Sequence, residues 1–432
     1  MHSFRRLACA LPVAVALTVP SMPAFPEDAG GAHPVFSDTG PDAFSYGKTL
    51  GYPVGLPARR QPYMVGNYSH YDSLHPSHLV ARANTASVLE RATTEIRASY
   101  RYDNRDLTIQ DYLARNPTTG LLIAKGNSIL FEHYQYGRND EQRFMSESMA
   151  KTFVSMLVGI AVEEHKIRSI DDAVQTYVPE LQHTEIGTVS IRALLHMASG
   201  IAFEQSYIHS DDNAQLHDLL LSPTGPGPIA TVKRFNKRLA EPDTVFSYAS
   251  LDTETLGLVL THATGMSLSE YLQTRIWQPM GAEADARWII DDTGQEIASC
   301  CFNATLRDYA RFGLLLAHDG AFNGRQIIPK QWVQDATQPA SPGSFLAMGK
   351  GEHPGGYGYQ VWLLPGSRRM FALEGVYGQR IFVDPESGLV LVHTAVRTKA
   401  IGSPGEAELR ALWRVLVKQY GSDSAANGLP IS

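Results

Sequence analysis

The sequence predicts an α/β protein of the α+β type, in which an antiparallel sheet is flanked by helices and carries an inserted, mostly helical domain. Strand patterns stand at both ends of the expected body, at 120–133 and 357–396, and helical patterns fill the chain between them. The 432 residues are 44% hydrophobic, which suffices for a sizeable core and excludes a disordered chain. The sheet is therefore expected to combine strands that are distant in sequence.

The first 24 residues predict a cleaved signal peptide. Arg5 and Arg6 precede an apolar stretch from Leu7 to Val19, and the small-residue site Met22–Ala24 follows. Because the stretch is shorter than the roughly 18–20 residues of a membrane-spanning helix, we expect a periplasmic or secreted protein without a stable membrane anchor. The expected segments are a signal peptide (1–24), an extended arm (25–117), a sheet domain (118–170 and 290–420), a helical domain (171–289) and a flexible tail (421–432).

Charge and cysteine content exclude several classes of partner and fold. The formal charge is −7, with 37 basic and 44 acidic residues, so a nucleic-acid partner is not expected, and the oligomeric state stays open. Of the three cysteines, Cys9 lies in the leader, and Cys300 and Cys301 are adjacent, a poor placement for an unstrained disulfide. We therefore expect no disulfide framework and interpret this pair as small buried apolar residues.

The arm is rich in Gly, Pro, His and Tyr, and its one clear helical pattern runs from Ala81 to Ala98. After it, the strand patterns Gly120–Lys125 and Ser128–His133 flank Gly126-Asn127, a two-residue connection typical of a β-hairpin. Apolar residues then recur at helical spacing from Ser148 to Glu164, which predicts a central buried helix. Later helices are expected at Ser190–Met197, Ser250–Ala263, Ser267–Ile276 and Glu406–Tyr420, and later strands at Tyr357–Leu364, Met370–Leu373, Gln379–Val383 and Leu389–Val396.

Ser148 and Lys151 open the central helix with a hydroxyl and an amine three residues apart, on one helical face. A desolvated lysine has a lowered pKa and can accept the serine proton while the hydroxyl attacks an acyl carbon. The alternative is a helix cap beside a snorkelling lysine. A second Ser-x-x-Lys match, Ser45 to Lys48, lies in the Gly- and Pro-rich arm and opens no apolar helix.

The segment Met145–Thr152 resembles the nucleophile region of the serine β-lactamase and penicillin-binding-protein superfamily. The likeness covers about residues 118–420 and is strongest toward 6-aminohexanoate-dimer hydrolases and β-lactamase-like carboxylesterases. It extends through the segments Ser190–Gly200, Phe246–Ser250, Asn303–Gly313 and Gly375–Pro385.

The resemblance implies that Tyr248, in the second motif, hydrogen-bonds Ser148 and Lys151 and passes a proton to the leaving group. The alternative for Tyr248 is a buried tyrosine that caps a helix. This motif ends in Ser250, where β-lactamases usually carry Asn.

The third motif, Lys-Thr-Gly in β-lactamases, reads Leu373–Gly375 here, so the lysine that holds a substrate carboxylate is missing. Gly375 still permits close backbone approach, and the N–H of Val376 is expected to join that of Ser148 in the oxyanion hole. Tyr207 falls in the loop that supplies a substrate-contacting tyrosine in the dimer hydrolases, against the alternative of a surface aromatic. Tyr207, Glu374 and Gly375 are therefore the expected substrate-binding residues.

Other catalytic patterns are missing from the sequence. It contains no Gly-x-Ser-x-Gly elbow, which excludes an α/β-hydrolase, and no phosphate loop. His70, His75 and His78 cluster in the arm, but their spacing fits no standard metal site, so we expect neither metal nor cofactor.

Together these observations predict an exported serine hydrolase that cleaves an ester or amide of a small molecule through an acyl-enzyme on Ser148, with Lys151 and Tyr248 managing protons. Two alternatives stay open. A β-lactamase or penicillin-binding protein would share the machinery, and a sensor would be acylated slowly or not at all.

Overall fold

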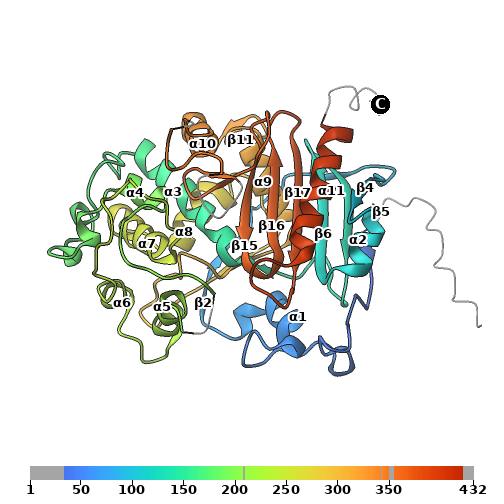
Figure 1. The fold of residues 1–432 in the computed structure, drawn as a ribbon, viewed down its shortest axis with the longest axis horizontal. Coiled ribbons are helices and arrows are strands. Elements are labelled where there is room, and N and C mark those ends of the chain that lie inside the picture. The colour runs from blue at the N-terminus through green and yellow to red at the C-terminus, as the bar shows by residue number, and fades with distance from the viewer. Residues whose placement is uncertain (1–33, 208–209, 342, 350–354, 422–432) are drawn as a thin grey trace, which may run out of the picture.

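The computed structural model describes residues 34–207, 210–341, 343–349 and 355–421, so the predicted signal peptide and nearly all of the predicted tail lie outside the described residues. Its main feature is a nine-stranded, mostly antiparallel sheet in the order β1-β7-β6-β17-β16-β15-β14-β13, with β3 also paired to β7. Helices cover both faces (Figure 1), which confirms the predicted fold class. The strands of this sheet are β1 (Val35–Phe36), β3 (Glu90–Arg91), β6 (Thr118–Lys125), β7 (Ser128–Tyr134), β13 (Gly356–Tyr357), β14 (Trp362–Leu363), β15 (Phe371–Gly375), β16 (Gln379–Asp384) and β17 (Leu389–Ala395).

Helices and a second, smaller sheet complete the body, and no described helix has the length and apolar character needed to cross a bilayer. The helices are α1 (Gln61–Ser69), α2 (Ile109–Arg115), α3 (Ala150–Glu163), α4 (Ile191–Leu195), α5 (Asp212–Leu221), α6 (Pro228–Val232), α7 (Ser250–Thr264), α8 (Leu268–Leu272), α9 (Leu306–Ala317), α10 (Lys330–Thr337) and α11 (Pro404–Tyr420). The second sheet has the order β2-β9-β10-β8, formed by Ser77–Val80, Ala286–Ile289, Phe302–Ala304 and Phe144–Met145. Two isolated hairpins are β4–β5 (Ser99–Tyr102 with Arg105–Thr108) and β11–β12 (Ala321–Phe322 with Arg325–Gln326).

The large sheet is buried on both faces, because alternate side chains of each central strand enter different cores. In β6, Leu122 and Ala124 belong to the larger core, which also contains the apolar residues of α3 and α9. Leu121 and Ile123 point the other way, into a core closed by α11. This two-sided burial explains why the strands read as nearly continuous apolar runs.

The predicted hairpin, central helix and final helix are confirmed by β6–β7, α3 and α11. The strand predicted from Tyr357 to Leu364 is wrong as one piece: it consists of β13 and β14 joined by a turn. In that turn the N–H of Gly358 donates to the carbonyl of Val361, and Gln360 takes a positive φ of 57°. The domain boundaries near residues 170 and 290 stay a prediction.

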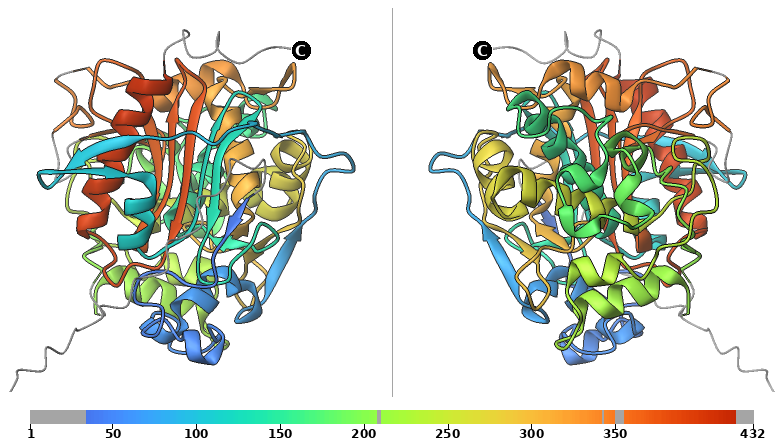
Figure 2. Two further views of the ribbon diagram at one scale, coloured as in Figure 1. Left: turned by 90° about the vertical axis from the view of Figure 1, so that its right-hand side faces the viewer. Right: turned by 90° about the vertical axis from the view of Figure 1, so that its left-hand side faces the viewer.

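The helix predicted from Ala81 to Ala98 is also wrong, since this stretch is extended and includes β3. Its backbone bonds to distant segments: the N–H of Ser87 donates to the carbonyl of Gly281, and that of Ala92 to the carbonyl of Ile129, both at 2.9 Å. Tertiary pairing here overrides a local helical preference. The N-terminal segments consequently run over the outside of the body (Figure 2).

Candidate active site

Ser148 lies in a 3-10 turn, Glu147–Met149, that leads directly into α3. The turn is held by the neighbouring strand β10, because the N–H of Ser146 donates to the carbonyl of Phe302 at 2.7 Å. Glu147 adopts a left-handed conformation with φ 46°, which costs energy for a residue with a side chain and is typical of functional turns. The Ser148 side chain is half-buried at the boundary between the helices and the large sheet.

The Lys151 side chain lies one helical turn further on and is almost completely buried, with 2% of the residue exposed. Its Nζ donates to Ser148 Oγ at 3.1 Å, to Ser250 Oγ at 3.3 Å and to the carbonyl of Ser299 at 2.7 Å. Burial lowers the pKa of Lys151 to about 7, although Glu254 and Glu147 favour the charged amine. At neutral pH this amine is therefore present in both protonation states, as a group that takes and returns a proton requires.

The second motif brings two side chains to Lys151. Ser250, at the start of α7, stands where β-lactamases usually carry Asn, and its hydroxyl accepts a hydrogen bond from Lys151 Nζ. The ring centroid of Tyr248 lies 5.3 Å from Lys151 Nζ. Tyr248 also stacks on Trp362 with centroids 5.4 Å apart, which holds the phenol in place. Burial raises the pKa of Tyr248 well above its ordinary value, and the neighbouring Ser148 side chain acts in the opposite direction.

The C-terminal end of β15 closes against the nucleophile turn. A Cβ on Gly375 would stand 2.5 Å from the carbonyl oxygen of Ser146 and 2.9 Å from Glu147 Cβ, so glycine is required for this approach. Val376, the next residue, lines the same cavity as Ser148. The geometry therefore agrees with the backbone approach that the third motif predicts.

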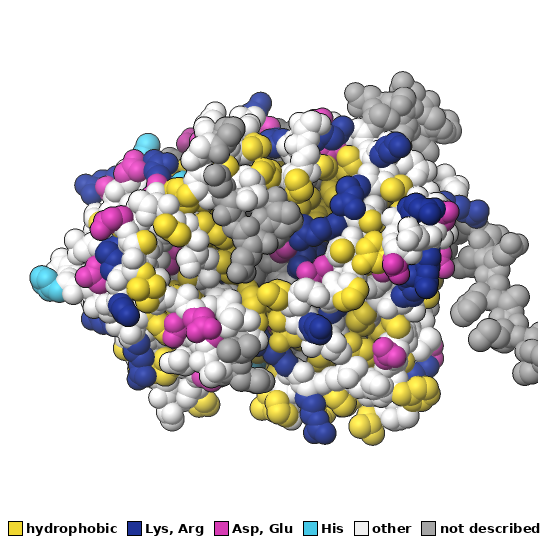
Figure 3. Space-filling model, in the orientation of Figure 1, with side chains coloured by type: hydrophobic (Ala, Val, Ile, Leu, Met, Phe, Trp, Pro, Cys, Tyr) yellow, Lys and Arg dark blue, Asp and Glu magenta, His cyan; other side chains and the backbone are white. Residues whose placement is uncertain are grey.

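Glu374 lies beside this end of β15 and is held by cations. Its carboxylate pairs with Arg410 at 2.9 Å and with Arg380 at 3.5 Å. The lysine position of the third motif is held by Leu373, and the cations near Glu374 come from β16 and α11. Figure 3 shows Lys and Arg side chains gathered in a hollow near the middle of this face of the molecule.

A small cavity surrounds the Ser148 hydroxyl. Ser148, Tyr207 and Val376 line it, as the sequence predicts, whereas Lys151 reaches Ser148 from within the core and Tyr248, Glu374 and Gly375 do not line it. Glu147 and Ser250 also line the cavity; both stand in segments that carry the family resemblance, but neither was predicted as a site residue. Sequence reasoning missed the remaining residues, which have no motif signal: Arg59, Gln205, Asn213, His217, Ser299 and Cys300.

His217 adds a neutral wall to the cavity. Its Nδ1 lies 2.9 Å from the carbonyl of Asn213, which fixes Nδ1 as the donor and leaves Nε2 as an acceptor facing Ser299 Oγ at 3.4 Å. Burial lowers the pKa of His217 to about 4, and the nearby cations Arg59 and Lys151 act in the same direction.

Tyr207 is half-buried and has a positive φ of 63°. Its hydroxyl accepts from Gln205 Nε2 at 3.1 Å, and its backbone N–H donates to Asp211 at 2.6 Å. Gln205 also accepts from the backbone N–H of Ser250 at 2.7 Å, which links the loop to the second motif. The loop aromatic thus faces the nucleophile cavity, although its part in binding stays a prediction.

The interpretation of the cysteine pair as free apolar residues is wrong, because Cys300 and Cys301 are joined by a disulfide. Both residues are buried, and Cys301 takes a positive φ of 70°. The pair follows Ser299, whose carbonyl accepts from Lys151, and Cys300 lines the nucleophile cavity. Because the two cysteines are adjacent in the sequence, we did not predict a disulfide between them. The backbone conformation in the structure shows the bond.

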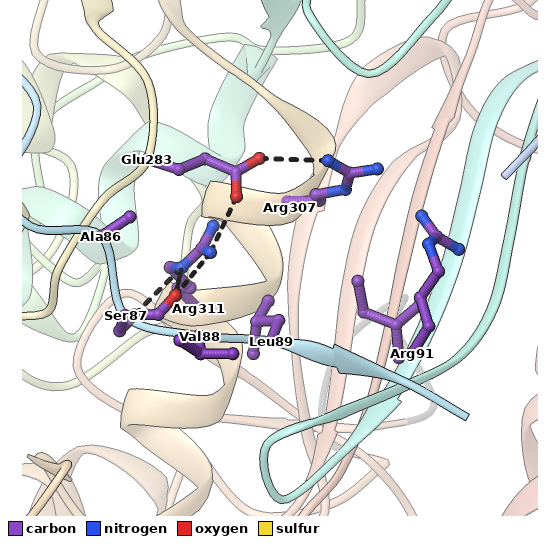
Figure 4. Close-up of a pocket in the computed structure, with 9 residues that line it drawn as sticks. Ala86, Ser87, Val88, Leu89, Arg91, Glu283, Arg307 and Arg311 are labelled. Atoms are coloured by element: carbon purple, nitrogen blue, oxygen red, sulfur yellow. Dashed lines mark hydrogen bonds and ion pairs between the residues drawn. The ribbon is translucent and has the colours of Figure 1, made fainter. Parts of the chain in front are cut away.

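A larger cavity of about 290 Å³ lies elsewhere, between the arm and α9. Figure 4 shows that Glu283, Arg307 and Arg311 point at one another and that Arg91 points away: Arg311 pairs with Glu283 at 2.8 Å and donates to the Ser87 carbonyl, while Arg307 lies 3.6 Å from Glu283. The bonds from Arg311 to Glu283 and Ser87 tie the arm to the body at this cavity.

The three arm histidines do not converge. His78 pairs with Glu296 at 2.8 Å, His75 packs on Tyr71, and His70 lies next to Ser69. Within the described ranges no group of His, Cys, Asp and Glu is arranged to hold a metal ion.

Three features meet at this site: a serine at the start of a buried helix, a lysine one turn later, and a strand that ends in glycine beside them. On an antiparallel sheet with helices on both faces, they define a hydrolase of the β-lactamase fold. The sequence pattern of the beta-lactamase family matches residues 106–412. The chain belongs to this family.

Individual relatives agree with this assignment. A 6-aminohexanoate-dimer hydrolase of Paenarthrobacter ureafaciens is 25% identical over 294 residues, which are 66% of this chain and 74% of the relative. A solved structure named as a candidate 6-aminohexanoate-dimer hydrolase of Bacillus anthracis is 25% identical, with a TM-score of 0.77, over 86% of this chain and 99% of its own. EstCE1, a hydrolase with promiscuous acyltransferase activity, shares the fold with a TM-score of 0.57 at 16% identity, over 71% of this chain and 96% of its own.

Proposed function

We propose that the chain is a serine hydrolase that cleaves an ester or amide of a small molecule through an acyl-enzyme on Ser148. The observation that carries the proposal is the 3.1 Å contact between Lys151 Nζ and Ser148 Oγ, made by an amine whose pKa burial lowers to about 7. A lysine in this state can accept the serine proton at neutral pH.

In the proposed first step Ser148 Oγ attacks the carbonyl carbon, and its proton passes to Lys151. The N–H groups of Ser148 and Val376 receive the oxyanion. When the intermediate collapses, the proton moves from Lys151, by way of Tyr248, to the leaving alcohol or amine. Water then attacks the acyl carbon, gives up a proton by the same route and releases the acid and the free Ser148 hydroxyl.

The names of two relatives, 6-aminohexanoate-dimer hydrolases, support an amide or ester as substrate. β-Lactam hydrolysis is less well supported, because Leu373 stands at the third-motif position where a lysine would attract a substrate carboxylate, and the carboxylate of Glu374 follows it. We also propose export, on the basis of the N-terminal signal-peptide pattern, and N-terminal sequencing of protein recovered outside the cytoplasm tests it.

A hydrolysis screen with short p-nitrophenyl esters, linear amides and nitrocefin tests the reaction class. We expect turnover of the neutral esters with a kcat/KM at least tenfold above that for nitrocefin. Intact-mass spectrometry during ester turnover should show one added acyl group on the wild-type protein and none on Ser148→Ala. Nitrocefin turnover equal to that of the esters would favour the β-lactamase alternative, and a burst without turnover would favour the sensor.

A further inference from the structure

The nucleophile cavity has one wall that comes from the N-terminal arm, outside the residues that match the family. Arg59 lies two residues before the start of α1 and lines this cavity together with Glu147, Ser148 and Val376. The arm therefore contributes a permanent positive charge to a site whose nucleophile belongs to the family body.

The loop that carries Arg59 is held in a defined conformation. The buried Asn67 side chain in α1 donates to the carbonyls of Gly55 at 2.8 Å and Ala58 at 2.7 Å, and accepts from the N–H of Gly55 at 3.0 Å. All three bonds are made to the residues just before Arg59. The buried Asn67 amide thus fixes the backbone conformation of the segment that leads to Arg59.

The guanidinium of Arg59 has no carboxylate within hydrogen-bond distance among the described residues. Its ion pair with Glu147 is 3.7 Å long, beyond hydrogen-bond distance, and the same Glu147 oxygen already accepts the Tyr68 hydroxyl at 2.6 Å. The central carbon of the guanidinium lies 5.4 Å from the ring centroid of Tyr377. Half of the Arg59 side chain is exposed, against 4% for Glu147, so the charge that an entering molecule meets first is positive.

We propose that Arg59 binds a carboxylate carried by the substrate, so that the hydrolase prefers esters or amides whose acyl part or leaving group is anionic. The inference rests on the proposed function. A planar guanidinium matches a carboxylate through two parallel hydrogen bonds. Tyr377, whose ring lies near the guanidinium, directly follows Val376, which carries the expected oxyanion donor.

This position differs from the carboxylate site of β-lactamases. In the third motif, Leu373 occupies the lysine position, and the next residue, Glu374, pairs with Arg410 and Arg380. Arg59 instead approaches from the arm, beyond the end of β15. The proposal therefore predicts recognition of an anionic group in a place that a β-lactam carboxylate does not reach.

The test compares matched esters by their kcat/KM ratio. Mono-p-nitrophenyl glutarate against p-nitrophenyl butyrate places the carboxylate on the acyl part, and 4-acetoxybenzoate against phenyl acetate places it on the leaving group. We expect one anionic ester to be preferred by the wild-type protein. Arg59→Gln should lower that ratio by about 10- to 100-fold, as the loss of a charge-assisted pair predicts. Arg59→Lys should retain part of the preference.

Arg60→Gln is the matched control, since Arg60 is an exposed neighbour that does not line the cavity, and it should leave the ratio as in the wild-type protein. If neither anionic ester is preferred, or if Arg59→Gln lowers both members of a pair equally, Arg59 only supports Glu147 and the proposal is wrong. Hydrolysis that survives Ser148→Ala would instead overturn the proposed function. Added salt should reduce the wild-type preference, because the arginine is half-exposed.

Discussion

The chain contains the same four-residue pattern twice, and the two copies lie in opposite surroundings. Ser45 is exposed in the arm, and the Lys48 amine pairs with Asp38 at 3.5 Å, with a third of its side chain exposed. Ser148 opens a buried helix, and the Lys151 amine donates to its hydroxyl with almost no contact with solvent. Among the described contacts only the second copy joins its serine to its lysine.

The comparison shows that the Ser-x-x-Lys spacing can bring the hydroxyl and the amine close together. Whether the amine can act as a base depends on the residues around it. A surface lysine beside a carboxylate stays protonated at neutral pH and cannot act as a base. The core around Lys151 removes solvent and offers a carbonyl and two hydroxyls, so the neutral amine becomes accessible. Four predictions test how far this contrast extends.

The largest effect is expected at the two serines. Ser148→Ala should abolish labelling by a fluorophosphonate probe and lower kcat more than about 1,000-fold, because the attacking oxygen is lost. Ser45→Ala should leave both unchanged. Labelling by in-gel fluorescence and ester hydrolysis measure the two outcomes, and a labelled Ser148→Ala protein would remove the distinction between the copies.

Lys151→Ala and Tyr248→Phe should each lower kcat by about 10²- to 10⁴-fold, the usual contribution of a positioned proton-transfer group. Their effects should not multiply, since both serve one proton path. Lys48→Ala is the control and should have no effect. A double variant whose loss equals the product of the single losses would show that the two groups act independently.

The pH dependence sharpens the contrast further. Because burial lowers the pKa of Lys151 to about 7 and the neutral amine is the active form, kcat/KM should fall about tenfold for each pH unit below that value. Above it, kcat/KM should level off. A pH profile measured with a neutral ester checks this. A flat profile between pH 5 and roughly 8 would show that the protonation of Lys151 does not control kcat/KM.

The smallest effect is expected at Ser250. Its hydroxyl is one of three acceptors around Lys151 Nζ, at 3.3 Å. Ser250→Ala removes a single hydrogen bond and should lower kcat about two- to tenfold, with a small shift of the pH profile. Steady-state kinetics across pH measures both. A loss as large as that of Lys151→Ala would mean that Ser250 takes part in proton transfer itself.

The sequence was most informative where a pattern is local. Short apolar runs on either side of the Gly126-Asn127 turn predicted β6 and β7, and period 3.6 predicted α3, because burial decides these elements residue by residue. The Ser148–Lys151 contact followed from helix geometry alone. The carboxyl-terminal strands were predicted for the same reason.

What the sequence left out depends on contacts between distant segments. Arg59 is separated from Ser148 by 89 positions in the numbering and carries no motif, so only the packing of the arm brings it to the cavity. His217 reaches the same wall from α5. The helix prediction for residues 81–98 failed for a related reason, because the hydrogen bonds of this extended stretch go to strands and turns elsewhere in the chain.

The parallel pairing of β1 and β3 with β7 has a consequence for the behaviour of the protein in solution. Together these short strands occupy Ser128–Ile129 and His133–Tyr134, near the two ends of the outermost long strand. An uncovered strand at that position would present free amide and carbonyl groups along its length and could recruit the same strand of another molecule. By covering this edge, the arm is expected to reduce edge-to-edge aggregation, and the same arm also reaches the nucleophile cavity.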